Sequence, residues 1–81
     1  MRVRLLFFAV LRDITGKSET DVSLPDGTKA ADVWQSLRRE HRALASYVKP
    51  PMIAINEDYA TPDTPLRDGD ELVFIPPVAG G

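Results

Sequence analysis

Cysteine is absent from this chain of 81 residues, and histidine occurs only once. The lack of thiols excludes a disulfide framework, a thiolate zinc site and a cysteine nucleophile. Long apolar runs are also missing, since the longest, Leu5–Leu11, falls far short of the roughly 18 residues expected of a membrane span. The N-terminus shows no signal-peptide pattern. We therefore expect a cytosolic protein that does not bind membranes.

An excess of positive charge is missing as well. The formal net charge is −2, which argues against a nucleic-acid binder driven by bulk charge. Residues 1–50 carry nine basic and six acidic side chains, whereas residues 51–81 carry one basic and six acidic side chains. The acidic C-terminal third suits a basic partner surface, although ordinary solubilising charge is the simpler explanation.

The size and composition indicate one folded domain over residues 1–81. A mass of 9.0 kDa allows a single small core, and a chain with 43 % hydrophobic and 27 % charged residues does not resemble a disordered one. Apolar alternation predicts strands over Arg2–Phe8, Glu19–Leu24, Met52–Ile55 and Glu71–Ile75, with a brief edge strand at Tyr59–Ala60. Helical periodicity predicts a short turn over Ala9–Ile14 stopped by Gly16, a main helix over Lys29–His41 with Thr28 as N-cap, and a short helix over Leu44–Val48.

The alternation also assigns faces to the first and last strands. Phe7 and Phe8 are consecutive and must point to opposite sides of a sheet. Val3 and Leu5 share the side of Phe7, and Leu72 and Phe74 match them in the last strand. The main helix offers an apolar stripe to this side, formed by Ala30, Val33, Trp34 and Leu37. The order of elements predicts an α+β fold of the β-grasp, ubiquitin-like kind, with a mixed sheet, its first and last strands paired centrally, and one main helix across one face.

Side chains typical of catalysis are scarce. His41 sits at a basic helix end, where a surface or capping role is the more common one. Asp68, Asp70 and Glu71 do not have the spacing of a calcium loop, and Gly69 among them is typical of a turn. No glycine-rich phosphate loop is present. We expect no metal site, no cofactor bound by this chain and no autonomous active site.

The C-terminal end is the first feature with chemical meaning. Residues 76–81 are predicted to form an extended functional tail that is stiffened at its root by Pro76 and Pro77 and continues through Val78. Gly80 lacks a Cβ atom, so the backbone there can pass through a narrow channel. The α-carboxylate of Gly81 would then reach a partner's active site, where adenylation and sulfur transfer would give a thiocarboxylate. A frayed chain end is the alternative interpretation.

An exposed apolar surface is the second feature. If the helix covers the side of Phe7, then Leu6, Phe8, Val73 and Ile75 lie uncovered on the opposite side, and Tyr59 joins them from the edge. An apolar cluster of this kind marks a partner-binding surface. The alternative is that residues 42–50 or a second copy of the chain covers it.

Four segments resemble one known family: Leu6–Asp13 with Gly16, Ala54–Asn56, Pro65–Glu71 and Phe74–Gly81. Together and in this order, they make the chain similar to the small subunit of molybdopterin synthase, the MoaD-type ubiquitin-like sulfur carrier. The resemblance covers nearly the whole chain, and the segment ending in Gly80–Gly81 is its most specific part.

The resemblance implies a β-grasp fold and a defined reaction cycle. A ubiquitin-activating-like adenylyltransferase would use ATP to adenylate Gly81, and a sulfur donor protein would complete the thiocarboxylate. The large catalytic subunit would then use the sulfur to build the molybdopterin dithiolene from a cyclic pterin precursor, in a heterotetramer. Phe8, Tyr59 and Ile75 would contact the partners.

Three other functions share parts of this pattern. Sulfur carriers of thiamine or cysteine biosynthesis and protein modifiers share the Gly-Gly end. A passive β-grasp interaction module would have the fold without activating its carboxylate. Exchange of pyrophosphate into ATP by an activating enzyme separates a carrier from such a module, and complementation with a synthase large subunit separates the carriers from one another.

Overall fold

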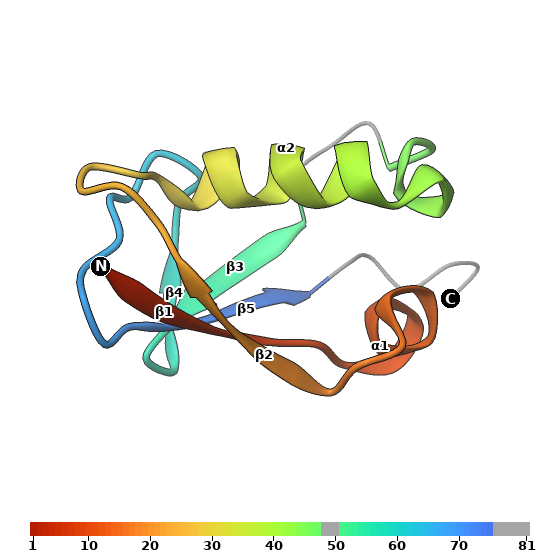
Figure 1. Ribbon diagram of the computed structural model, residues 1–81, viewed down its shortest axis with the longest axis horizontal. Coiled ribbons are helices and arrows are strands. Elements are labelled where there is room, and N and C mark those ends of the chain that lie inside the picture. The colour runs from red at the N-terminus through yellow and green to blue at the C-terminus, as the bar shows by residue number, and fades with distance from the viewer. Residues whose placement is uncertain (48–50, 76–81) are drawn as a thin grey trace.

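The computed structural model describes residues 1–47 and 51–75, which form one five-stranded sheet with a helix across one face (Figure 1). The strands follow the order β2-β1-β5-β3-β4. They are β1 (Arg2–Leu6), β2 (Glu19–Ser23), β3 (Met52–Ile55), β4 (Asp58–Ala60) and β5 (Glu71–Ile75). The helices are α1 (Ala9–Thr15), α2 (Ala30–Glu40) and the 3-10 turn η1 (Arg42–Leu44). The predicted β-grasp architecture is confirmed.

The first and last strands meet at the centre of the sheet, as predicted. β1 and β5 run parallel, with Leu5 opposite Leu72, while β2 pairs antiparallel with β1. β3 is antiparallel to both β5 and β4. Parallel strands end at the same edge of a sheet, so β1 and β5 bring Phe8 and Ile75 to one end of the molecule. No helix in residues 1–47 or 51–75 is long and apolar enough to cross a membrane.

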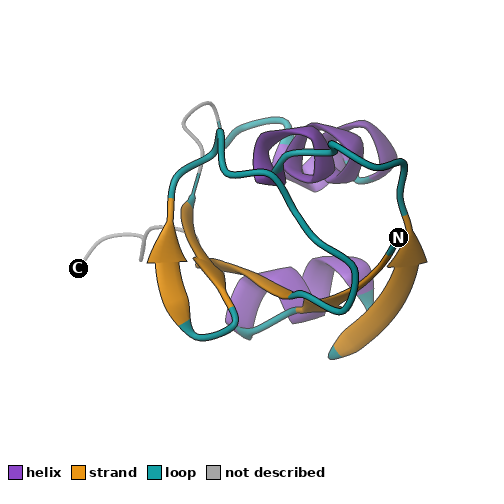
Figure 2. Cartoon of the chain, turned by 90° about the vertical axis from the view of Figure 1, so that its left-hand side faces the viewer, coloured by secondary structure: helices purple, strands orange, loops and turns teal. Residues whose placement is uncertain are grey.

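The core lies between the sheet and α2 (Figure 2). The predicted faces are correct: Phe7 is 2 % exposed, and Phe8 is 55 % exposed. At the centre of the core, the rings of Trp34 and Phe74 lie 5.1 Å apart. The helix stripe faces the sheet, and the buried set is Val3, Leu5, Phe7, Leu11, Ala30, Val33, Trp34, Leu37, Leu44, Ile53, Leu66, Leu72 and Phe74.

Two predictions about local structure are wrong. The N-cap of α2 is Lys29 and not Thr28, because the hydroxyl of Thr28 donates to the carbonyl of Pro25 at 2.7 Å. The carboxylate of Asp32 instead accepts the N–H of Lys29 at 2.9 Å, which satisfies one of the free donors at this helix end. A negative side chain also suits the positive end of the helix dipole.

The short helix predicted over Leu44–Val48 is replaced by η1. Leu44 is fully buried directly after α2, so it anchors this segment in the core and ends the turn there. The N–H of Ala45 bonds to the carbonyl of Arg42, which is the tighter spacing of a 3-10 turn. Residues 45–47 are not helical, and Val48 lies outside the described residues.

A hydrogen-bond network ties the β3–β4 turn to the start of β5. The carboxylate of Asp70, which is 9 % exposed, accepts the N–H of Arg67 at 2.7 Å and the amide of Asn56 at 2.8 Å. The side-chain oxygen of Asn56 in turn accepts the N–H of Glu71 at 3.0 Å. Asn56 has a φ of 52°, a conformation that asparagine tolerates better than most residues. The network therefore fixes the edge hairpin against the central strand.

Replacing Asp70 with alanine is expected to lower the free energy of unfolding by about 2–4 kcal/mol. The change leaves two donors without their acceptor, and hydrogen bonds to charged groups are worth about 1.5–3 kcal/mol each, with imperfect additivity. Urea unfolding measures the loss. Asp63→Ala is the matched control, since Asp63 is exposed and should change stability by less than about 0.5 kcal/mol. Equal effects of the two substitutions would contradict the role of the network.

Candidate partner-binding surface

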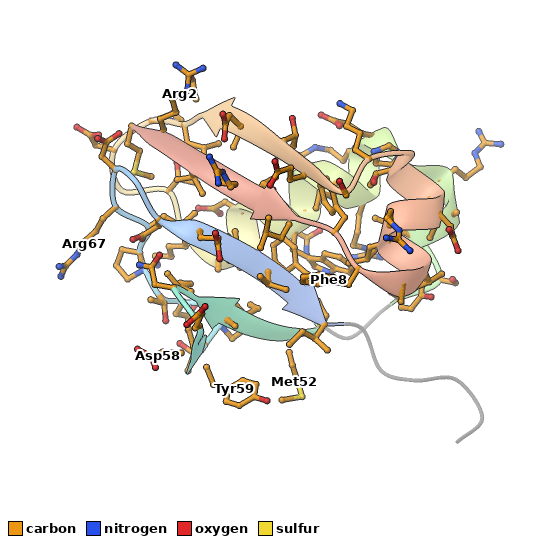
Figure 3. The ribbon with its side chains drawn as sticks, turned by 90° about the horizontal axis from the view of Figure 1, so that it is seen from below. Arg2, Phe8, Met52, Asp58, Tyr59 and Arg67 are labelled. Atoms are coloured by element: carbon orange, nitrogen blue, oxygen red, sulfur yellow. The ribbon has the colours of Figure 1, made fainter. Side chains whose placement is uncertain are left out.

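The sheet face opposite α2 carries a continuous apolar area, seen from below in Figure 3. One cross-strand row runs over four strands, because Leu6 pairs with Val73, Val73 with Ala54, and Ala54 with Tyr59. These four residues stand at successive strand positions of the same face. We call the area the apolar surface and define it as Leu6, Phe8, Met52, Ala54, Tyr59, Val73 and Ile75.

The next row of the apolar surface lies near the end of β5 and holds two of the three most exposed side chains, Phe8 and Met52. Met52 pairs with Ile75, and Phe8 follows the parallel strand β1. The exposed fractions are 55 % for Phe8, 56 % for Met52 and 75 % for Tyr59. Large apolar side chains that stay this exposed next to one another mark an interaction site. The structure thus brings together all five predicted residues that it describes: Leu6, Phe8, Tyr59, Val73 and Ile75.

Phe8 owes its outward position to the turn between β1 and α1. Its backbone is still extended, with φ −118° and ψ 156°, and so continues the alternation that buries Phe7. Ala9 then reverses the chain with a φ of 49°, in the left-handed region that alanine rarely occupies. The carbonyl of Phe8 accepts the N–H of Leu11 at 3.0 Å and closes the first turn of α1. The helix start therefore holds Phe8 at the border of the sheet.

Charged residues occupy the other end of the same sheet face. Arg4 is paired with Asp21 at 3.6 Å and stands opposite Glu71 on β5. The backbone N–H of Arg2 donates to the carboxylate of Asp68 at 2.7 Å. In Figure 3, Arg2 and Arg67 lie at the end away from Phe8. The face is thus apolar where β5 ends and charged where β5 begins.

The remaining predicted site residues lie beyond the end of β5. Pro76, Pro77, Val78, Gly80 and Gly81 fall outside the described residues. Ile75, the last residue of β5, belongs to the apolar surface and directly precedes Pro76 in the chain. Any partner that covers the apolar surface therefore contacts the residue from which this segment starts.

Met52 was not predicted as a site residue. Its strand was correctly predicted, and Ile53 within it is buried, so alternation puts Met52 and Ala54 on the outer face. Alternation could have identified Met52. However, all four residues of the strand are apolar, so the sequence does not show which of its two sides is exposed.

No group of three or more metal-ligating side chains occurs among residues 1–47 and 51–75. His41 forms the C-terminal boundary of α2, where its Nε2 lies 3.9 Å from the carboxylate of Glu40. His41 therefore occupies a helix end, as expected for a capping role, and does not lie among the polar groups that a catalytic site would need.

Comparison with known proteins points to one family. The ThiS family model matches residues 5–81. The molybdopterin synthase sulfur carrier subunit of Chlamydomonas reinhardtii is 36 % identical, and all of both chains is covered. The protein of the same name from Escherichia coli is 35 % identical over 98 % of this chain and 99 % of its own.

Solved structures agree with this family. SAMP1 from Haloferax volcanii has a TM-score of 0.80 and 26 % identity, and all of both chains is covered. A chain in the Helicobacter pylori complex of subunits 1 and 2 of molybdopterin-converting factor has a TM-score of 0.65 and 26 % identity, again over all of both chains.

Proposed function

This chain belongs to the ThiS family, and we propose that it is the sulfur-carrier subunit of molybdopterin synthase. The observation that carries the proposal is the position of the apolar surface at the end of β5. Ile75 links that surface to a segment that reaches Gly81 within six residues. A partner that recognises the surface is thereby placed next to the group that reacts. Relatives with this name match the chain over nearly its full length.

The chemistry centres on the carboxylate of Gly81. A carboxylate is a poor acyl donor, so an adenylyltransferase first joins it to AMP and releases pyrophosphate from ATP. A sulfur donor protein supplies the nucleophile that replaces AMP, and the product is a thiocarboxylate. Two such carriers in turn each give one sulfur to a cyclic pterin precursor in the large catalytic subunit, where the two sulfurs form the dithiolene and each Gly81 returns to a carboxylate. ATP belongs to the activating partner, and this chain itself holds no cofactor.

Two tasks fall to this chain's own residues in the cycle. The apolar surface binds each partner, since exposed aromatic and aliphatic side chains bury area without costly desolvation of charge. Gly80 lets the backbone enter a narrow channel, because it lacks a Cβ atom. The Helicobacter pylori complex, in which the similar chain is found with a second subunit, supports a large subunit as one of the partners.

Two measurements test the proposal. The chain is incubated with ATP, an adenylyltransferase of the family and a sulfur donor, and mass spectrometry detects the exchange of one oxygen for sulfur. The product is then mixed with a synthase large subunit and the pterin precursor, and molybdopterin formation is followed. Absence of adenylation would contradict the carrier function. Thiocarboxylate that no synthase accepts would instead point to another sulfur pathway.

Protein modification is the second candidate function, favoured by the similarity to SAMP1, the small archaeal modifier protein 1 of Haloferax volcanii. A modifier would also activate Gly81, but an amine would then take the place of the sulfur nucleophile. Conjugates that retain the carboxyl-terminal glycines on lysine side chains, combined with no synthase activity, would decide for this candidate.

Replacing Gly80 with valine is expected to lower the rate of sulfur delivery about 100-fold or more, with a smaller loss for Gly80→Ala. The added side chain restricts φ and meets the channel wall, and a misplacement of about 1 Å costs on the order of 100-fold in rate. Single-turnover conversion of precursor by preloaded carrier measures the effect. Melting temperatures of the variants should match the original chain. Unchanged rates for Gly80→Val would show that the channel is wide.

A further inference from the structure

A cleft separates β2 from α2 on the helix side of the sheet, away from the apolar surface. Its volume is about 860 Å³. Its apolar lining is formed by Leu5, Phe7, Val22, Leu24, Val33 and Leu37. Val22 and Leu24 are only partly buried, although they pack against the core. The cleft therefore leaves two apolar side chains accessible beside α2, Val22 in β2 and Leu24 directly after it.

β2 is an edge strand, and its outer backbone groups have no partner in the described sheet. The N–H of Phe7 donates to the carbonyl of Ser18, and the N–H of Leu24 donates to the carbonyl of Met1. In an antiparallel pair, hydrogen bonds to the neighbour alternate along the strand. With this register, the groups of Thr20 and Val22 point to β1. The N–H and C=O groups of Glu19, Asp21 and Ser23 consequently point to the open edge.

The charges around the cleft are not equally available. Asp32 accepts the N–H of Lys29 at the start of α2, and Glu40 lies 3.9 Å from His41. Lys17 and Arg39 also line the cleft, and in the described part of the chain neither has a carboxylate within 4.0 Å. The guanidinium of Arg39 donates to the hydroxyl of Ser36 at 3.2 Å. Asp32 lies in the first turn of α2, so at the opposite end of the cleft, where α2 ends, two cations face the single carboxylate of Glu40.

The acidic side chains of β2 do not oppose this attraction from inside the cleft. Asp21 is paired with Arg4 at 3.6 Å on the other sheet face. Glu19 is two positions away from Asp21 and shares that face by alternation. Lys17 directly precedes β2, and Arg39 lies in the last turn of α2, so the positive end of the cleft is the end where β2 begins.

We propose that this cleft binds an extended peptide segment of a partner protein, added as a further strand antiparallel to β2. Its outward backbone groups pair with those of Glu19, Asp21 and Ser23, and its alternate apolar side chains enter the cleft. An acidic residue follows these side chains toward the peptide's carboxyl end. There it meets Lys17 and Arg39. The site is independent of the sulfur-carrier function because the apolar surface lies on the opposite sheet face, so both faces can be occupied together.

The test uses the full chain and a synthetic probe, acetyl-Gly-Val-Thr-Val-Thr-Val-Asp-Asp-Gly-amide. Titration into ¹⁵N-labelled protein should give saturable amide shifts at residues 19–23 and along α2, and little change at the apolar surface. N-methylation of the probe on the backbone groups that face β2 should abolish binding, whereas methylation of the alternate groups should preserve it. Both N-methylated probes are tested on the unaltered protein, so a loss of binding cannot result from a folding defect.

Charge reversal gives a second, separable readout. Lys17→Glu combined with Arg39→Glu should weaken binding of the probe about ten-fold, which lies within the range for two exposed ion pairs. A probe with lysine in place of both aspartates should recover the loss. Arg12→Glu is the matched control, because Arg12 is exposed and does not line the cleft. An unchanged affinity of the double variant would overturn the assignment of an acidic ligand.

Three other outcomes would overturn the proposal as a whole. They are a probe that gives no saturable shifts, shifts confined to Phe8 and Ile75, and self-association through β2 in the absence of probe. The last outcome would identify a second copy of the chain as the occupant, and it is measured by sedimentation at increasing protein concentration.

Discussion

Removal of Gly81 is expected to abolish sulfur transfer by this chain while its thermal unfolding stays the same. The reactive carboxylate would then belong to Gly80, one residue short of the position that the partner's active site requires. One extended residue spans about 3.3–3.6 Å, which far exceeds the tolerance of about 1 Å for a reacting atom. The buried core among the described residues ends at Phe74, so the deletion removes no core contact.

The measurement combines a thermal melt with precursor conversion by the preloaded carrier. A variant with one alanine appended after Gly81 is the matched control, because it keeps both glycines and displaces the carboxylate in the opposite direction. Both variants should be inactive and should melt like the original chain. Full activity of the shortened chain would sink the proposed function.

Phe7→Ala and Phe8→Ala are expected to act on different properties of the protein. Phe7 is 2 % exposed in the core, so its truncation should cost about 3–5 kcal/mol of the free energy of unfolding. Phe8 is 55 % exposed on the apolar surface, so its truncation should cost less stability. Loss of an aromatic anchor should instead weaken binding of the large catalytic subunit by about 1–3 kcal/mol.

Urea unfolding and calorimetric titration with the large subunit separate the two effects. The neighbouring positions make each variant the control for the other, since both remove the same ring from adjacent residues. A larger loss of stability for Phe8→Ala than for Phe7→Ala would contradict the strand register. An unchanged affinity of Phe8→Ala would remove this residue from the interface.

Alternation carried most of the successful prediction. Val3, Leu5 and Phe7 occupy every second position, and side chains with a period of two can point only to one or the other of two sheet faces. The stripe of α2 is similarly determined by its period. Once these faces are assigned, the apolar surface follows as the remainder, and Leu6, Phe8 and Ile75 are found without knowledge of the fold.

The sequence did not predict features that depend on which of several hydrogen bonds forms, or on where one element packs against another. Thr28 is the better N-cap by residue type, but its hydroxyl is used by the carbonyl of Pro25, and the carboxylate of Asp32 serves Lys29 instead. The cleft beside β2 depends on where α2 crosses the sheet, which no local pattern encodes. Alternation within β3 places Met52 and Ile53 on opposite faces, but the strand contains no polar residue that would show which face is exposed.

The central pairing of β1 with β5 has a consequence for how the chain is made. Residues 4–6 bond to residues 71–73, so the sheet cannot close until nearly all of the described chain has been synthesised. Such distant contacts also slow folding, because the intervening chain must be ordered before the contacts form. The apolar surface draws residues from β1, β3, β4 and β5, and it therefore comes into existence at the same late step. Ribosome-bound chains that lack β5 therefore present neither the assembled apolar surface nor Gly81, and a partner that requires both can engage only the finished fold.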